Sequence, residues 1–370
     1  MKHYGHVIVG GGVAGGSVAE EYRNHGGNGS VLLVGSERHV PYNRPPLTKE
    51  FLRGEVSESD TWMHSADWWA QREVDLWLGS EVGAIDPTGR TVQLVDGRRV
   101  QYDRLVLATG ATPRQLDGTD TIRSIDDARR VARQLGGKVG RLGVIGGGFI
   151  GVEVAASARM KGWDVTMAVP ESVIWERMFG AEVGAYFQAK LTGQGVRVLN
   201  GQTTLPTSES FDLVIAGIGV SPNIAVATAA GLPSNSGVLV NEHLLATADI
   251  WAVGDIAEYQ SIIHGHRLRV EHWDVALNQG AYVGRSWAGV EDEPYDVLPY
   301  FFSDIGDWTS LEYVGSGSGP PRIDGSMDDD SFAAYYTDAG GRLTACLTVN
   351  RSEELNAAKN QIGGHEVVTR

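Results

Sequence analysis

Two glycine-rich turns constrain this chain more than any other feature of its sequence. The first, Gly10-Gly11-Gly12-Val13-Ala14-Gly15, follows an apolar strand predicted over 6–9 and precedes a predicted helix over 17–25 and a strand over 31–34. In such a βαβ unit the first glycine permits a tight turn and the second lets the backbone approach a pyrophosphate. The third lets helix and strand pack closely. The pattern predicts a dinucleotide-binding fold.

The same pattern returns about 135 residues later, as Gly146-Gly147-Gly148-Phe149-Ile150-Gly151. A strand is predicted over 141–145, a helix over 152–161 and a second strand over 164–169. Each helix start offers free N–H groups and a positive dipole end to phosphates. One such unit serves one pyrophosphate, so the chain is predicted to bind two dinucleotides. A nicotinamide donor and a bound flavin are the pair that makes a hydride relay.

An acidic residue is expected near the end of each second strand, where it bonds ribose hydroxyls. Glu37 is the candidate in the first unit, and a solvated turn charge is the alternative. In the second unit Glu171 is the candidate, and no basic residue follows until Arg177. An acid without a nearby arginine favours NADH over NADPH. Glu171 lies two residues later than usual, so a shifted loop would reverse this preference.

Composition excludes several other classes of protein. The single cysteine, Cys346, rules out an internal disulfide, a CxxC redox pair and a multi-cysteine metal site. The net charge of -15 argues against a general nucleic-acid binder. No apolar stretch approaches the roughly 18 residues of a membrane span, and the first residues do not resemble a signal peptide. We therefore expect a cytoplasmic protein whose redox chemistry comes from an organic cofactor.

Further segments resemble one known family. Residues 41–49, PYNRPPLTK, resemble the PYxRPPLSK segment of FAD-dependent, NAD(P)H-linked ferredoxin and rubredoxin reductases, a group that includes monodehydroascorbate reductases and apoptosis-inducing factors. The runs ATG at 108–110, WAVGD at 251–255 and EHW at 271–273 match further motifs of this group. The resemblance covers nearly the whole chain.

The resemblance implies roles for three charged residues. Arg44 would neutralise the FAD pyrophosphate, and Lys49 would reach the flavin ring near N5, where a cation stabilises developing negative charge. Glu153 would lie against the nicotinamide in an ion pair with Lys49. The alternatives are a solvated surface lysine and a glutamate that serves only the dipole at the start of its helix.

The resemblance also implies neighbours for the flavin. Asp255 would bond the ribityl chain, with capping of the next helix as an alternative or additional role. Glu271, His272 and Trp273 would line the flavin, His272 as lining rather than as an acid, while Trp273 shapes the nicotinamide pocket or belongs to the core. Phe302 stands where relatives usually carry tryptophan, which weakens the inference about the electron acceptor.

The candidate catalytic residues are Lys49 and Glu153. The candidate cofactor-binding residues are Gly10, Gly12, Val13, Ala14, Gly15, Glu37, Arg44, Lys49, Val82, Ala108, Thr109, Gly110, Gly146, Gly148, Phe149, Ile150, Gly151, Glu153, Glu171, Gly217, Ile218, Gly219, Asp255, Glu271, His272, Trp273 and Phe302.

We predict an α/β fold with two Rossmann-like, three-layer domains and a small C-terminal α+β domain. The FAD domain is split over 1–112 and 246–297, the NAD(H) domain covers 113–245, and the C-terminal domain covers 298–370. In that last part we expect a hairpin of 331–336 and 342–349, and a helix near 353–361. His264-Gly265-His266 is interpreted as a hairpin turn rather than a metal site, and Cys346 as a small core residue.

The resemblance implies hydride transfer from NADH to FAD, then single electrons to an acceptor. The first hypothesis for that acceptor is a small iron–sulfur protein or rubredoxin. The second is a small radical or quinone, as for monodehydroascorbate reductases. A redox-sensing interaction protein like the apoptosis-inducing factors is the third, disfavoured because their long extra segments and basic surface are lacking. No metal, nucleic-acid or membrane partner is expected.

Overall fold

The chain divides into two units, and each contains one of the glycine turns. The computed structural model describes residues 1–364. Unit 1 comprises 1–43, 59–112 and 222–299, and unit 2 comprises 44–58, 113–221 and 300–370. The chain passes between the units five times, and two of these connections run through β7 (Ala111–Pro113) and β12 (Val220–Pro222), which pair as a two-stranded ladder.

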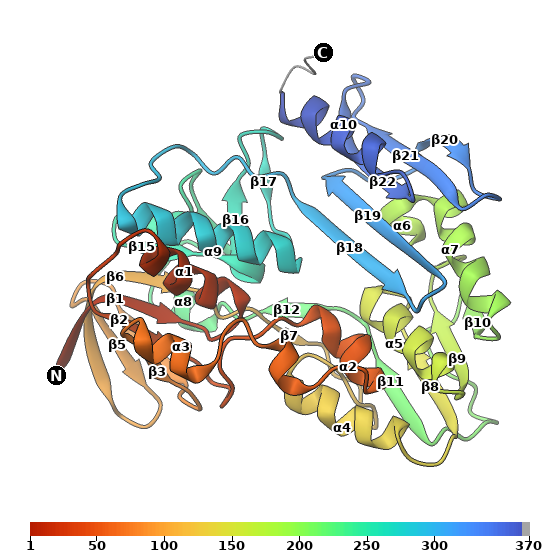
Figure 1. The fold of residues 1–370 in the computed structure, drawn as a ribbon, viewed down its shortest axis with the longest axis horizontal. Coiled ribbons are helices and arrows are strands. Elements are labelled where there is room, and N and C mark those ends of the chain that lie inside the picture. Colours follow the sequence, from red (N-terminus) through yellow and green to blue (C-terminus); the bar gives the residue numbers. More distant parts are fainter. Residues whose placement is uncertain (365–370) are drawn as a thin grey trace. The chain divides into compact units, whose positions relative to one another are not determined.

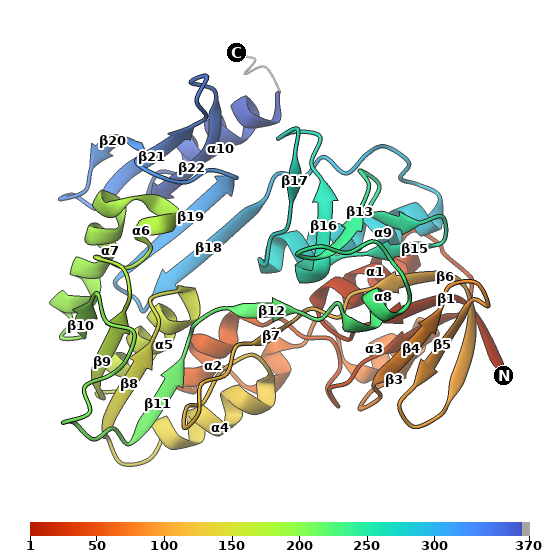
Figure 2. The ribbon, with the colours of Figure 1, turned by 180° about the vertical axis from the view of Figure 1, so that it is seen from behind.

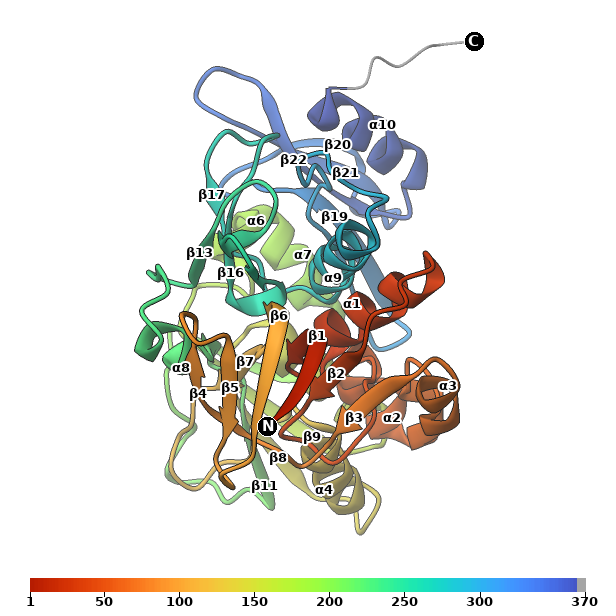
Figure 3. The same cartoon turned by 90° about the vertical axis from the view of Figure 1, so that its left-hand side faces the viewer.

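Unit 1 is built on an eight-stranded sheet with the path β14-β15-β6-β1-β2-β3, in which β4 and β5 extend from β6. Figure 3 shows the part of this sheet that contains β1 to β6. The strands β15, β6, β1, β2 and β3 run parallel. Residues 31–34 are buried throughout, as expected for a strand covered on both faces. The strands are β1 (Lys2–Val9), β2 (Val31–Val34), β3 (Val74–Trp77), β4 (Val82–Asp86), β5 (Thr91–Leu94), β6 (Arg99–Leu107), β14 (Leu245–Thr247) and β15 (Ile250–Ala252).

Two helices of unit 1, α1 (Val13–Asn24) and α9 (Trp273–Ala288), pack closely together (Figure 1). A Cβ atom on Gly280 would lie 2.3 Å from the carbonyl oxygen of Ala14, and one on Gly284 would lie 2.6 Å from that of Val18. Only glycine allows this approach. Unit 1 also contains the short helices α3 (Ala66–Gln71), α8 (Ala225–Ala229) and η3 (Gly254–Ile256). A small sheet consists of β13 (Val238–Val240), β16 (Ala257–Gln260) and β17 (Arg267–Leu268). The helix η2 (Glu58–Thr61) spans the point where the chain returns from unit 2 to unit 1.

Unit 2 contains a four-stranded parallel sheet with the order β10-β9-β8-β11 (Figure 2). The second glycine turn follows β8 and leads into α5. The elements are η1 (Pro45–Thr48), α2 (Glu50–Arg53), α4 (Ile125–Leu135), β8 (Arg141–Ile145), α5 (Phe149–Met160), β9 (Asp164–Val169), α6 (Glu176–Phe179), α7 (Ala181–Gly193), β10 (Arg197–Asn200) and β11 (Leu213–Ala216).

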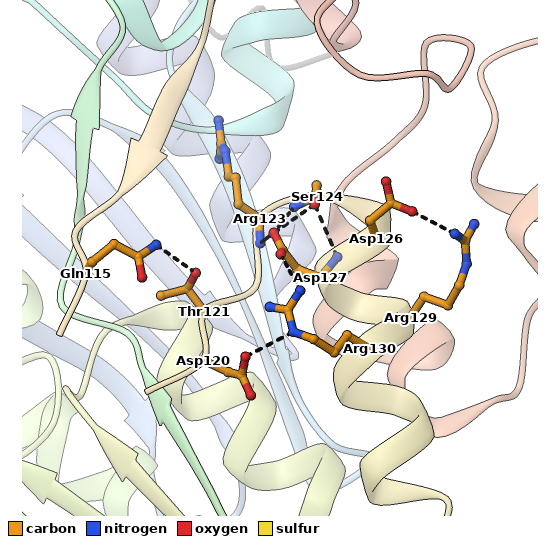
Figure 4. Close-up of polar contacts among 9 residues, drawn as sticks. All are labelled: Gln115, Asp120, Thr121, Arg123, Ser124, Asp126, Asp127, Arg129 and Arg130. Carbon is orange, nitrogen blue, oxygen red and sulfur yellow. Dashed lines mark hydrogen bonds and ion pairs between the residues drawn. The ribbon is translucent and has the colours of Figure 1, made fainter. Parts of the chain in front are cut away.

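The segment that enters α4 is fixed against the edge of this sheet (Figure 4). The backbone of Asp120 exchanges hydrogen bonds of 2.8 Å with Val214 and Ala216 of β11. Arg130 donates to the Asp120 carboxylate at 3.0 Å and to Asp127 at 3.1 Å. Ser124 and Asp127 form a capping box, which satisfies the free N–H groups at the helix start.

The last part of unit 2 is an antiparallel sheet with the order β18-β19-β22-β21-β20, followed by α10. The predicted hairpin and C-terminal helix are confirmed. Cys346 is fully buried in β22, as the prediction of a core residue required. The elements are β18 (Tyr300–Ile305), β19 (Thr309–Gly315), β20 (Arg322–Ser326), β21 (Ser331–Thr337), β22 (Leu343–Val349) and α10 (Ser352–Gly363).

The predicted fold class is confirmed, and three predicted strands have the observed bounds. Both Rossmann helices begin earlier than predicted, because Gly12 and Gly148 are their N-cap residues. Glu153 therefore lies in the second turn of α5, and the prediction that it opens this helix is wrong. The three-domain division stays a prediction. Residues 222–245 belong to unit 1, and residues 300–370 to unit 2.

The structure also bears on the His264-Gly265-His266 segment, on metal sites and on membrane helices. The segment around Gly265 is a hairpin turn, since β16 pairs antiparallel with β17 and Gly265 has a φ of 71°. Among residues 1–364 no cluster of His, Cys, Asp or Glu has a metal-site arrangement. Within the same range, no helix has both the length and the apolar character needed to cross a bilayer.

Candidate functional site

The first glycine turn has the geometry of a dinucleotide cradle. Gly10 has a φ of 128°, and a Cβ atom there would lie 2.0 Å from the carbonyl oxygen of Ala108. A Cβ on Gly15 would lie 2.0 Å from the carbonyl oxygen of Gly10. At Gly12, by contrast, a Cβ would meet no protein atom within 4 Å, and no side chain caps the helix that starts there. The turn is closed on the protein side and open where a pyrophosphate would approach.

The second turn repeats this arrangement within unit 2. Gly146 has a φ of 105°, and a Cβ there would lie 2.3 Å from the carbonyl oxygen of Gly217. A Cβ on Gly151 would lie 2.4 Å from the carbonyl oxygen of Gly146, whereas one on Gly148 would meet only the Gly217 oxygen, at 3.6 Å. Gly219 also has a positive φ, of 95°. The predicted glycines that follow β8 and β11 therefore lie together at the carboxyl ends of these two strands.

Other candidates in unit 1 lie around its glycine turn and along neighbouring segments. Glu37 accepts a hydrogen bond from the hydroxyl of Tyr42 at 2.6 Å. Thr109 donates to the carbonyl of Asn223 at 2.7 Å, and Gly110 has a φ of 65°. Val13, Ala14, Val82, Ala108 and Asp255 are buried.

The EHW segment, residues 271–273, lies at the N-terminus of α9. His272 is the N-cap residue, and burial lowers the pKa of its imidazole to about 4, against the opposing effect of the Asp255 charge. His272 is therefore neutral near pH 7, and its lining role stays a prediction. Trp273 donates from Nε1 to Asn43 at 2.8 Å, and Glu271 pairs with Arg269.

Unit 2 contains a buried polar cluster around Glu153. The Glu153 carboxylate accepts from Thr48 Oγ1 at 2.5 Å and from Ser303 Oγ at 2.7 Å. Lys49 Nζ lies 3.7 Å from Glu153 and 3.2 Å from Asp304. The predicted Lys49–Glu153 pair is thus present, but Asp304 is the nearer partner of the lysine. Both Lys49 and Glu153 side chains are less than a tenth exposed.

Burial raises the pKa of Glu153 above its usual value. The positive charge of Lys49 and the hydrogen bonds from Thr48 and Ser303 act in the opposite direction, while the negative charge of Asp304 adds to the rise. Desolvation of a carboxylate and a like charge nearby both favour the protonated form. Glu153 is therefore a carboxyl group whose protonation responds to the charges around it.

Three members of this cluster were not among the sequence candidates: Thr48, Ser303 and Asp304. Thr48 and Ser303 are neighbours of the predicted residues Lys49 and Phe302. The only signal in the sequence is that they adjoin candidate residues, because side chains near a buried ion pair satisfy its remaining hydrogen bonds. No single-residue pattern distinguishes them otherwise.

Of the remaining candidates of unit 2, Phe302 lies beside the polar cluster and the others lie elsewhere in the unit. The Phe302 ring lies 4.7 Å from Lys49 Nζ and its side chain is 38% exposed. Arg44 donates to the backbone carbonyl of Arg123. Phe149 packs against Trp175 with ring centroids 5.0 Å apart, while Ile150 is 39% exposed. Glu171 follows β9, and Ile218 lies between the two glycines after β11.

Comparison with known proteins identifies the family of this chain. Residues 4–280 match the model of the pyridine nucleotide-disulphide oxidoreductases. The chain belongs to this family. It is 35% identical to putidaredoxin reductase from Pseudomonas putida, over 96% of this chain and 91% of that protein. It is 28% identical to monodehydroascorbate reductase 3 of Arabidopsis thaliana, over 96% and 92% of the two chains.

The structural comparison agrees. A solved structure of the covalent putidaredoxin reductase–putidaredoxin complex matches with a TM-score of 0.90 and 33% identity, over 98% of this chain and 93% of that chain. The resemblance to ferredoxin reductases and monodehydroascorbate reductases is confirmed. The chain is a pyridine nucleotide-dependent flavoprotein oxidoreductase, with FAD and NAD(H) as its cofactors.

The family description includes disulphide chemistry, which this chain cannot perform internally. Its one cysteine is fully buried in β22, and burial raises the pKa of the thiol to about 12. A reactive cysteine is an accessible thiolate with a lowered pKa. Electrons must therefore leave from a bound cofactor rather than through a cysteine pair.

Proposed function

We propose that this protein is a ferredoxin reductase, which takes hydride from NADH on FAD and delivers single electrons to a small iron–sulfur protein or rubredoxin. The observation that carries the proposal is the pair of complete glycine turns, one in each unit. Similarity to putidaredoxin reductase, over nearly the full length of both chains, supports the choice of acceptor.

The residues present fit two dinucleotides. Gly12 and Gly148 have extended backbone conformations, leave open space on their outer side, and begin helices whose first N–H groups have no side-chain cap. Such helix starts bind phosphates. We propose that the first turn, with Glu37 and Asp255, binds FAD, and that the second turn, with Glu171, binds NADH.

Bound FAD supplies the acceptor for hydride and the means to release electrons one at a time. On the resemblance, we propose that Lys49 stabilises negative charge on the flavin, that Arg44 neutralises the FAD pyrophosphate, and that Glu153 orients the nicotinamide. Within unit 2, Glu153 and Asp304 both lie within ion-pair distance of Lys49, while Thr48 and Ser303 donate hydrogen bonds that fix the carboxyl group of Glu153. Buried polar groups are normally hydrogen-bonded in this way.

The test is anaerobic reoxidation of the NADH-reduced flavin. Separate samples are mixed with a [2Fe–2S] ferredoxin, with rubredoxin and with a quinone, and flavin absorbance is followed. Faster reoxidation by either protein acceptor supports the proposal. Reoxidation only by the quinone refutes it in favour of the second candidate.

That second candidate is reduction of a small radical or quinone, and the likeness to monodehydroascorbate reductase 3 favours it. Generating the ascorbate radical in the presence of the enzyme and NADH, and following NADH oxidation, tests this activity directly. Because NADH is an intracellular coenzyme, either function places the protein in the cytoplasm in this proposal.

A further inference from the structure

A pocket in unit 1 lies where the turns of two hairpins meet β6. It has a volume of about 250 Å³. Figure 3 shows β4, β5 and β6, which carry part of its lining. The lining residues are Pro87, Thr88 and Arg90 between β4 and β5, Tyr102 of β6, and residues 247–250, where β14 turns into β15. Segments from distant parts of the chain therefore form one concave site, the usual shape of a small-molecule site.

This pocket is separate from the first glycine turn. The turn follows the end of β1, where Val9 pairs with Leu107 of β6. Tyr102 instead pairs with Tyr4, near the start of β1. It lies five residues before Leu107, about 17 Å along the strand. A molecule in the pocket therefore leaves the proposed FAD site free.

Tyr102 supplies a buried polar group at this pocket. Its side chain is 1% exposed, and its hydroxyl has no hydrogen-bond partner among residues 1–364. The charges that act on this hydroxyl are those of Arg90 and Asp249, which line the pocket, and of Asp86 at the end of β4. The hydroxyl is therefore directed towards the pocket. A buried donor without a partner is unfavourable, which favours a ligand with an acceptor atom.

The charges around the pocket favour an uncharged ligand. Burial raises the pKa of Tyr102 to about 12, so its hydroxyl is protonated near neutral pH and can donate. Asp249 forms an ion pair with Arg90, and Asp86 adds a second carboxylate. An anion is repelled by this surplus negative charge. A cation would have to give up its hydration to enter.

The Arg90–Asp249 ion pair connects the two turns that border the pocket. The side chains of Arg90 and Asp249 are 49% and 39% exposed. An ion pair as exposed as this contributes little stability, so it opens at little cost. Behind it, Pro87, Ala248 and Ile250 provide apolar lining. The pocket thus combines an apolar wall with one buried hydrogen-bond donor.

We propose that this pocket is a binding site for a small uncharged organic molecule, which has an apolar body and a hydroxyl or carbonyl oxygen. The Arg90–Asp249 pair opens, the oxygen accepts a hydrogen bond from Tyr102, and the apolar body packs against the apolar lining. A pocket of this volume holds about eight water molecules. Replacing loosely held water with an apolar group favours binding. The proposal goes beyond the proposed function, and neither depends on the other.

The probe for this site is benzyl alcohol, which is uncharged and has one hydroxyl group beside an apolar ring. Benzoate is its anionic counterpart. FAD and NAD⁺ are present at saturating concentration, so that the probe does not enter the proposed coenzyme sites. Saturation-transfer NMR follows the signals of the probe and gives its dissociation constant. We expect a value of about 1 mM for benzyl alcohol, and binding of benzoate at least tenfold weaker.

Three variants test which residues form the site. Tyr102→Phe removes the donor and should weaken benzyl alcohol binding at least threefold. Ala248→Phe fills the pocket from an exposed position and should abolish binding. Tyr259→Phe is the matched control and should change nothing. The hydroxyl of Tyr259 is also buried without a partner among residues 1–364, but Tyr259 does not line the pocket. Neither tyrosine variant loses a hydrogen bond, so both should fold.

A fourth variant tests the ion pair. Asp249→Asn weakens the contact with Arg90 and should bind benzyl alcohol about twofold more tightly, because less of the pair must be opened. Weaker binding by this variant would overturn the assigned opening. Absence of saturable binding to wild type, equal affinity for benzoate, equal effects of Tyr102→Phe and Tyr259→Phe, or unchanged binding in Ala248→Phe would each overturn the site itself.

Discussion

At the scale of single residues, the most informative group is the carboxyl of Glu153. It is buried, and burial raises its pKa and so favours the protonated form. Two hydroxyl donors and one lysine act against this, yet the lysine lies closer to Asp304 than to Glu153. Burial is the largest influence on the pKa of Glu153, and the competition of Glu153 and Asp304 for one lysine adds to it.

Replacing Asp304 tests this balance. Asp304→Asn removes a negative charge that raises the pKa of Glu153 and leaves Lys49 to Glu153 alone, so this pKa should fall. The acid limb in the pH profile of flavin reduction by NADH, followed by anaerobic stopped flow, should move to lower pH. Glu153→Gln, which lacks the titrating group, should lose that limb.

A matched control is Asp307→Asn, which removes the same charge from an exposed residue of the adjoining turn. It should leave the pH profile unchanged. If Asp304→Asn and Asp307→Asn shift the profile equally, the effect is one of general surface charge and the assigned role of Asp304 is wrong.

A second residue, His6, makes the fold sensitive to acid. It lies between Tyr22 and Trp287, at ring distances of 4.4 and 4.7 Å. Burial, together with the charges of Arg104 and Arg23, lowers the pKa of His6 to about 4. The unfolded chain takes up this proton near pH 6.5 and the folded chain does not. Stability is therefore lost as pH falls from about 6.5 towards 4.

His6→Leu should remove this loss. Between pH 7 and 4.5 the free energy of unfolding of wild type should fall by about 2 kcal/mol more than that of the variant. Urea titrations at the two pH values measure the difference. Because the pKa of His272 is lowered in the same direction, the variant keeps part of the acid sensitivity. Equal pH dependence in both proteins would exclude His6 as its source.

At the scale of elements, glycines decide where helices begin and how closely they pack. Gly12 and Gly148 start α1 and α5, so that each helix points its free N–H groups at the end of a strand. Gly280 and Gly284 then lie on the face of α9 that meets α1. The second pair has helical spacing in the sequence, four residues apart, but the sequence does not show what it contacts, because the facing backbone comes from a helix more than two hundred residues away.

Gly284→Ala should destabilise unit 1. The new methyl carbon would lie 2.6 Å from the carbonyl oxygen of Val18, so one helix must move. Overpacking of this kind costs about 1–3 kcal/mol. Gly193→Ala in α7 provides the contrast, since a Cβ there meets nothing within 4 Å and should stabilise by about 0.5 kcal/mol. Thermal unfolding midpoints should therefore move in opposite directions; a shared direction would contradict this account of the helix contact.

At the scale of the whole molecule, a structural feature can be predicted from the sequence when the residues that form it are close together in the chain. Both glycine turns were predictable, because a turn, a strand and a helix follow one another within about 30 residues. The Lys49–Glu153 pair was predictable only through resemblance, since about a hundred residues separate its members. Asp304 as the nearer partner of Lys49 was not predictable. Nothing in the chain near residue 304 specifies a distance to residue 49.

The two turns should be separable by experiment. In Gly12→Ala and Gly148→Ala the added methyl group meets no protein atom closer than 3.6 Å, and both backbones have conformations that alanine adopts without strain. Both variants should fold. The methyl group would occupy the space through which a pyrophosphate approaches, so each variant should lose one dinucleotide.

Gly12→Ala should purify with little flavin and bind added FAD at least tenfold more weakly, a loss of about 1.4 kcal/mol or more. Gly148→Ala should keep its flavin absorbance and bind NADH at least tenfold more weakly. Absorbance spectra and NADH titrations measure both effects, and circular dichroism verifies the fold. Because each turn belongs to a different unit, the two losses should be independent. Loss of flavin from Gly148→Ala, or full flavin occupancy in Gly12→Ala, would contradict the assignment of one coenzyme to each turn.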